Sequence, residues 1–119
     1  MAARAAARLE DLGYTDVAEL AGGISAWDAA GYEVSADELA AMFERGEDLV
    51  VFDSRLVPEF RHFSIPGGVC CPGAELVYRV GEMAPDSETT VVVNCAGRTR
   101  SIIGAQSLID AGIPNRVVA

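Results

Sequence analysis

The sequence predicts an α/β fold with a mostly parallel central sheet and helices on both faces. Two continuous apolar runs, residues 49–52 and 91–93, are short and rich in valine, which is typical of strands buried on both sides. Segments with apolar residues at helical spacing alternate with such runs along the chain. This alternation favours parallel strands joined by helices in three layers.

The first part of the chain predicts a small set of elements. Residues 2–13 have the composition of an Ala-rich helix, and residues 17–20 suit a short strand. A Gly-Gly turn then precedes a short helical segment at residues 24–30, in which Trp27 is expected to pack against a core.

The second part begins with Ser35, which has Glu38 three residues later. This capping-box pattern predicts the start of a helix over residues 36–45. Further elements follow from apolar periodicity and from Gly and Pro signals. They are a helix at 58–63, a strand at 69–71, a helix from 72 to about 80, a helix that follows the 91–93 strand and stops at Gly112, and a strand at 117–119.

Composition limits the function classes. A chain of 119 residues, half of them apolar, supports one compact domain. No apolar run approaches the ~20 residues that a membrane span needs. The segment 1–8 is too short and too interrupted by arginine to predict a targeting peptide. A net charge of −9 argues against nucleic acid or an anionic membrane as partner.

The three cysteines, Cys70, Cys71 and Cys95, are too few for an even disulfide framework. With the single His62 they show no metal-ligand spacing. The sequence therefore implies no metal, and a reducing cytoplasm is the expected compartment.

Cys95 stands at the end of the 91–93 strand, where open α/β sheets bind ligands. The loop after it carries Arg98 and Arg100 and opens a helix, whose N-terminus favours negative charge. These neighbours are expected to make Cys95 a reactive, readily ionised thiol. Gly97 is expected to adopt a turn conformation that other residues avoid. The competing hypothesis for Cys95 is a buried small apolar residue.

The segment Cys95-Ala96-Gly97-Arg98-Thr99-Arg100-Ser101 resembles the active-site loop of rhodanese-type sulfurtransferases. The resemblance implies a rhodanese-like domain without a metal or organic cofactor. Cys95 would accept a sulfane sulfur from a donor such as thiosulfate, hold it as a persulfide, and pass it to a thiol or cyanide. The loop residues would bind the substrate, with Arg100 favoured over Arg98 as the ligand of an anionic donor.

Related phosphatases of the same fold have five residues between the cysteine and the arginine. Here four residues separate Cys95 from Arg100, and this shorter loop favours sulfur over phosphate. Two further hypotheses stay open. In one the chain is a non-catalytic binding module, and in the other it is a redox-sensing protein in which Cys95 pairs with Cys70 or Cys71.

A second match to the rhodanese family precedes the loop. Asp53-Ser54-Arg55, Glu59-Phe60 and Ile65-Pro66-Gly67-Gly68 resemble its first signature, although Phe63-Ser64 stands where the family usually has Gly-His. We expect Asp53 and Arg55 to form an ion pair at the strand end, with a supporting role at the site. His62 is expected to be a surface residue.

The two ends of the chain resemble each other. Residues 3–20 and 101–119 both predict a helix followed by a strand. This predicts a segment of a tandem rhodanese protein, with residues 1–34 as the tail of one repeat and residues 35–119 as a domain that lacks its last helix. Residues 20–34 are expected to replace that helix, within the same chain or in a swapped homodimer.

Overall fold

The computed structural model describes residues 23–119 of a chain that divides into two compact units, Met1–Gly31 and Tyr32–Ala119. In the first unit the described part is α2 (Gly23–Ala29), the helix expected around Trp27, whose indole is buried. The helix expected at residues 2–13 and the strand at 17–20 lie outside the described residues.

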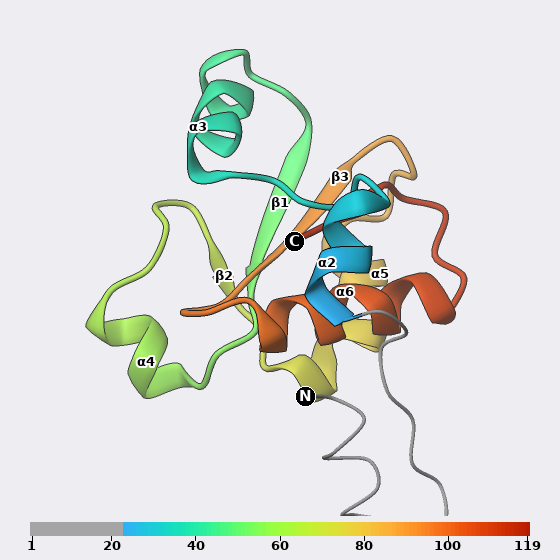
Figure 1. The fold of residues 1–119 in the computed structure, drawn as a ribbon. Helices are drawn as coiled ribbons and strands as arrows, with labels where there is room; N and C mark the ends of the chain where they lie inside the picture. The colour runs from blue at the N-terminus through green and yellow to red at the C-terminus, as the bar shows by residue number, and fades with distance from the viewer. Residues whose placement is uncertain (1–22) are drawn as a thin grey trace, which may run out of the picture. The chain divides into compact units, whose positions relative to one another are not determined.

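The second unit contains the elements predicted for it, with ends that differ by a few residues (Figure 1). Strands and helices alternate along this unit, as the periodicity indicated. In chain order they are α3 (Ala36–Glu44), β1 (Leu49–Asp53), α4 (Val57–His62), β2 (Val69–Cys70), the 3₁₀ turn η1 (Gly73–Glu75), α5 (Leu76–Met83), β3 (Thr90–Asn94), α6 (Thr99–Asp110) and β4 (Val117–Val118).

The sheet has the strand order β2-β1-β3-β4, and every neighbouring pair is parallel. At its centre β1 and β3 pair along their whole lengths, from Leu49 beside Thr90 to Asp53 beside Asn94. From β1 the chain continues to β2 at one edge of the sheet, and from β3 it continues to β4 at the other edge. Such a reversal of strand order opens a crevice at the carboxyl ends of the two strands.

Helices cover both faces of this sheet, which confirms the predicted α/β class. On one face Val92 of β3 belongs to an apolar cluster with Leu39 of α3. On the other face the neighbouring Val93 approaches α6, where a Cβ added at Gly104 would lie 3.4 Å from a Val93 methyl group. Successive strand residues point to opposite faces, so the valine run supplies both layers of the core.

Two local signals place the elements around the site. The Ser35 hydroxyl accepts a hydrogen bond from the Glu38 N–H at 3.1 Å, as the capping pattern predicts. After α4, the Gly68 N–H donates to the Ile65 carbonyl at 2.9 Å, while Gly67 has a φ of 81°. This is the geometry of a type II turn, which requires glycine at that position. The turn leads the chain from α4 into β2.

The two compact units meet between Gly31 and Tyr32, three residues before Ser35, at which the sequence places the start of the second domain. Two backbone hydrogen bonds of 3.0 Å attach residues 32–34 to the end of the second unit, from the Ala119 N–H to the Tyr32 carbonyl and from the Val34 N–H to the Ala119 carbonyl. The exchange of residues 20–34 for a missing helix stays a prediction, because residues 20–22 lie outside the described part.

Within residues 23–119, no helix is long and apolar enough to cross a membrane.

Core packing of α6 gives a first prediction. Leu108 is fully buried on α6, so Leu108→Ala should lower the free energy of unfolding by about 2–5 kcal/mol, through lost apolar contact and an added cavity. Ile103 on the same helix is 57% exposed, and Ile103→Ala should change stability by only about 0.5 kcal/mol. Urea denaturation followed by circular dichroism measures both. Equal losses would contradict this packing.

Candidate active site

Cys95 is the first residue after β3, and its position is set by the central strand pair. Beyond the last paired residues, the Ser54 N–H donates to the Asn94 carbonyl at 2.8 Å and the Ser54 hydroxyl donates to the same oxygen at 3.0 Å. Ser54 therefore fixes the peptide that immediately precedes the cysteine. The sequence placed Ser54 in the signature of the family but did not identify this function.

The loop after Cys95 turns directly into α6. The Arg98 carbonyl accepts hydrogen bonds from the Ile102 N–H at 2.9 Å and from the buried Ser101 hydroxyl at 3.0 Å. In the part of the chain that the structure describes, several backbone N–H groups of the loop make no hydrogen bond. They are those of Ala96, Gly97, Thr99, Arg100 and Ser101. A cluster of such donors at a helix N-terminus is able to bind an anion.

The Cys95 residue is only 9% exposed, and its Sγ donates to the Gly97 carbonyl at 3.1 Å. The expectation about Gly97 is wrong, because Gly97 is not among the glycines with positive φ and a Cβ there would contact nothing within 4 Å. What Gly97 contributes is a carbonyl turned toward the sulfur. This hydrogen bond needs the thiol proton, so it is lost when Cys95 ionises.

Asp53 and Arg55 form the ion pair expected at the end of β1. The Arg55 Nη2 lies 2.7 Å from the Asp53 Oδ2, and its Nε donates to both carboxylate oxygens. The side chains are only 4% and 2% exposed, for Arg55 and Asp53 respectively. The hydrogen bonds to Asp53 raise the pKa of Arg55 above its ordinary value. The pair therefore buries two opposite charges at the end of β1 with no net charge.

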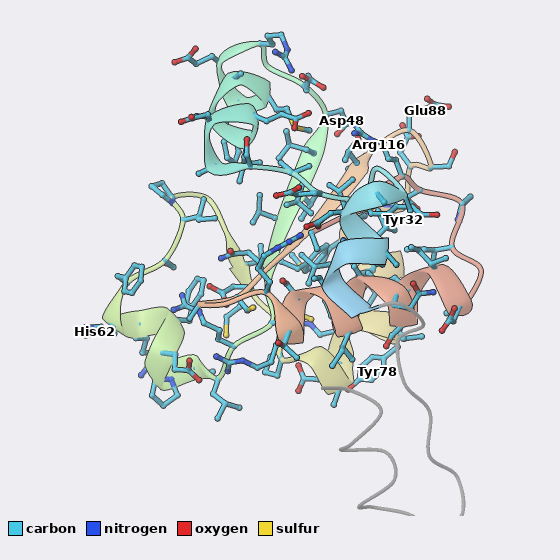
Figure 2. The ribbon with its side chains drawn as sticks, viewed as in Figure 1. Tyr32, Asp48, His62, Tyr78, Glu88 and Arg116 are labelled. Carbon is cyan, nitrogen blue, oxygen red and sulfur yellow. The ribbon has the colours of Figure 1, made fainter. Side chains whose placement is uncertain are left out.

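Phe63 completes the surroundings of Arg55. Its carbonyl accepts a hydrogen bond of 2.7 Å from Arg55 Nη2, and its ring lies 5.2 Å from the guanidinium carbon. Phe63 stands where the family usually has the glycine of its Gly-His pair. In this chain the main-chain carbonyl at that position supports Arg55. His62 is exposed, as expected, and packs edge-on against Phe63; Figure 2 shows it on α4.

Arg100 makes a two-pronged ion pair with Glu59 of α4. Both guanidinium nitrogens, Nη1 and Nη2, lie 2.9 Å from the carboxylate oxygens. The side chains are 47% and 39% exposed. This hydrogen bonding raises the pKa of Arg100 and lowers that of Glu59. Sequence reasoning did not identify Glu59 as a site residue, because nothing local shows that α4 faces the loop.

An open hollow of about 430 Å³ lies beside the loop. Ala96, the residue next to Cys95, forms part of its wall, and the rest comes from the end of β1 and from α4. The lining residues are Arg55, Pro58, Glu59, His62, Phe63 and Ala96. One member of each ion pair, Arg55 and Glu59, therefore lines this hollow.

The other two cysteines are poorly placed to pair with Cys95. In the sheet Cys70 is level with Asp53, and Asp53 is level with Asn94, so two strand spacings separate Cys70 from the cysteine loop. Two spacings amount to about 9–10 Å, whereas a disulfide needs Cα atoms within about 7 Å. Cys71 is fully buried, and burial raises the pKa of its thiol. This geometry disfavours the redox-sensing hypothesis.

The family model of the Rhodanese-like domain matches residues 35–119, from the start of α3 to the end of the chain. The chain belongs to the rhodanese-like family. Within solved structures, 98% of this rhodanese-like chain matches a thiosulfate sulfurtransferase from Pseudomonas aeruginosa at 47% identity and a TM-score of 0.73. The match spans 27% of the length of that protein.

More distant rhodanese-fold structures share the architecture alone. A human single-domain sulfurtransferase is 24% identical, with a TM-score of 0.61, over 75% of this chain and 89% of its own. A Rhodopseudomonas palustris protein described as a possible tyrosine phosphatase is 20% identical, with a TM-score of 0.66, over 88% of this chain and 86% of its own. The comparison with curated proteins gives no match.

The buried ion pair gives a second prediction. Asp53→Asn removes the carboxylate and leaves the Arg55 guanidinium charged in a nearly water-free position, so the urea midpoint of unfolding should fall clearly. The control is Arg45→Gln, which breaks the ion pair of Arg45 with Glu47, also two positions apart in the sequence. This pair is exposed, so its loss should change the urea midpoint little. Similar effects of the two substitutions would show that burial does not strengthen the Asp53 pair.

The exposed ion pair gives a third prediction. Glu59 should titrate below the ordinary glutamate value of 4.5, because Arg100 stabilises its charged form. The pair contributes its full stabilisation above pH 4.5, the ordinary pKa of glutamate. This contribution is lost as the pH falls through the lower pKa that Glu59 has in the folded state. Side-chain carboxyl ¹³C NMR should show the Glu59 pKa rising in Arg100→Gln and staying unchanged in Arg45→Gln. An equal Glu59 pKa in both variants would contradict the pairing.

Proposed function

We propose that this rhodanese-like chain transfers a sulfane sulfur, from a donor such as thiosulfate to a thiol or cyanide, through a persulfide on Cys95. The observation that carries the proposal is the placement of Cys95. It lies at the carboxyl end of a central parallel strand, within a loop whose free N–H groups and helix N-terminus suit an anionic sulfur.

In the first step the Cys95 thiolate attacks the outer sulfur of thiosulfate. The sulfur–sulfur bond of the donor breaks, its electron pair leaves with sulfite, and Cys95 carries the transferred sulfur as a persulfide. Before this, the thiol must lose its proton and with it the hydrogen bond to the Gly97 carbonyl. The unbonded loop N–H groups are proposed to stabilise the terminal persulfide sulfur as it becomes negative.

In the second step an acceptor attacks the terminal sulfur of the persulfide. Cyanide takes it as thiocyanate and a thiol takes it as a new persulfide, and in both cases the electron pair of the broken bond returns to Cys95 as thiolate. The hollow supports this proposal, because Ala96, the residue next to Cys95, lines it and leaves space beside the loop for a small reactant.

The surrounding residues have positioning roles in this proposal. Ser54 holds the end of β1 against the peptide before Cys95, and the buried pair of Asp53 and Arg55 is proposed to keep that strand end in place. Arg100 is proposed to attract the oxygens of an anionic donor with the guanidinium N–H groups that Glu59 does not engage. Arg98 is proposed to contribute a further positive charge.

The chemistry of the site also supports proposals about the cellular compartment and the reactants. A free thiol as the working group suits a reducing compartment such as the cytoplasm, and small-molecule sulfur compounds suit a hollow of this size. We also propose a tandem arrangement of rhodanese repeats, supported by the likeness of residues 3–20 to residues 101–119. Completion by residues 20–34, in cis or in a swapped homodimer, belongs to that proposal.

Intact-mass spectrometry tests the function. After incubation with thiosulfate, the full chain should gain the mass of one sulfur atom, and cyanide should remove it with release of thiocyanate. Cys95→Ser should abolish both the gain and the transfer, because no thiolate is left to attack. Cys70→Ser is the matched control and should keep both, since its thiol is separated from the loop by β1.

Two outcomes would overturn the proposal. A folded chain that acquires no sulfur from thiosulfate or from a thiosulfonate would be a non-catalytic binding module. Hydrolysis of an aryl phosphate that is lost in Cys95→Ala would instead identify a phosphatase, the activity that the four-residue spacing between Cys95 and Arg100 disfavours.

A further inference from the structure

Two arginines near the hollow are paired with carboxylates, and one member of each pair, Arg55 or Glu59, lines the hollow. Arg55 is held by Asp53 in a buried pair, and Arg100 is held by Glu59 in a partly exposed one. Both arginines carry a charge of the sign that an anionic sulfur donor needs. Each of these charges is nevertheless offset within hydrogen-bond distance, before any donor arrives.

The two ion pairs differ in how easily an entering reactant could disturb them. Asp53 receives several hydrogen bonds from Arg55 and is almost fully buried. It cannot move away without leaving the buried Arg55 charge unpaired. Glu59 is 39% exposed and lines the hollow, and both of its carboxylate oxygens accept hydrogen bonds from Arg100. An anion that approaches Arg100 is therefore repelled by the carboxylate of Glu59.

We infer that Glu59 determines the charge of the sulfur donor that the Cys95 loop accepts, by occupying Arg100 and disfavouring a dianion such as thiosulfate relative to a donor of lower charge. This inference rests on the proposed sulfur transfer and names the donor class of the same site. Glu59 acts through Arg100 and through its own field in the hollow, so it is a residue of specificity rather than of catalysis.

The physical argument is a difference between two donors. The Glu59 carboxylate repels a dianion twice as strongly as a monoanion at the same distance, and it also competes with either for Arg100. Thiosulfate is a dianion that leaves sulfite, whereas methanethiosulfonate is a monoanion that leaves methanesulfinate. In both reactions the Cys95 thiolate forms the new sulfur–sulfur bond and the old one breaks with its electron pair on the leaving group.

The test compares these two donors in the full chain and in Glu59→Gln, which keeps the size and polarity of the side chain. The control is Glu88→Gln, which changes net charge equally. Glu88 is exposed and precedes β3, at the opposite end of the strand from Cys95; Figure 2 shows it far from His62 of α4. Circular dichroism verifies that each variant is folded.

Glu59→Gln should raise the kcat/KM ratio of thiosulfate to methanethiosulfonate by about 3- to 10-fold, the effect of one unit charge a few ångströms away in a nearly aqueous medium. Glu88→Gln should leave the ratio unchanged. The gain should shrink in high salt, because the Debye length falls from about 10 Å at 0.1 M to about 3 Å at 1 M. A ratio in Glu59→Gln equal to that of the unmodified chain, with normal persulfide formation on Cys95, would overturn the inference.

A binding measurement separates this inference from the proposed function. In a Cys95→Ser background, where no sulfur can be transferred, NMR titration of the loop amides measures the affinities of thiosulfate and methanethiosulfonate. Adding Glu59→Gln should improve thiosulfate binding by the same ~3- to 10-fold relative to the monoanion. This result would hold even if the unmodified chain transferred no sulfur. Unchanged relative affinities would overturn the role of Glu59 whatever the catalytic outcome.

Discussion

The candidate site depends on the pairing of β1 with β3. These strands are level along their whole lengths, and Ser54 extends the contact by binding the Asn94 carbonyl twice. Because the strands are parallel, the residues that follow both of them meet at one edge of the sheet. Cys95 and the Asp53–Arg55 pair are neighbours for this reason, although about forty residues separate them along the chain.

Charge neutralisation is the second feature of the site. Arg55 after β1 and Arg100 in the cysteine loop are both positively charged, but the folded chain offsets Arg55 with Asp53 and Arg100 with Glu59. The buried pair is costly to break, because removal of one partner would leave the other charge buried without its counter-ion. The exposed pair borders the hollow and is weak enough for a reactant to perturb. The site therefore combines one buried ion pair that stays fixed with one exposed ion pair that a reactant can disturb.

Much of the second unit could be predicted from the sequence because its signals are local. Valine runs marked the central strands, Ser35 and Glu38 marked a helix start, and the turn before β2 required glycine at position 67. The predictions for residues 1–22 concern a part of the chain that the structure does not describe. The expectation about Gly97 failed because the loop takes its shape from the strand end and from α6 rather than from a left-handed residue.

By itself the sequence determined the family, the fold class and the position of Cys95 between a strand and a helix, because each depends on residues close together in the chain. Only the tertiary structure decided which groups surround that cysteine. It brought Glu59 to Arg100 across 41 positions of sequence, turned the Gly97 carbonyl toward the thiol, and separated Cys70 from Cys95 by a strand. Such contacts depend on how α4, the loop and the sheet pack together, and no local pattern of residues encodes that packing.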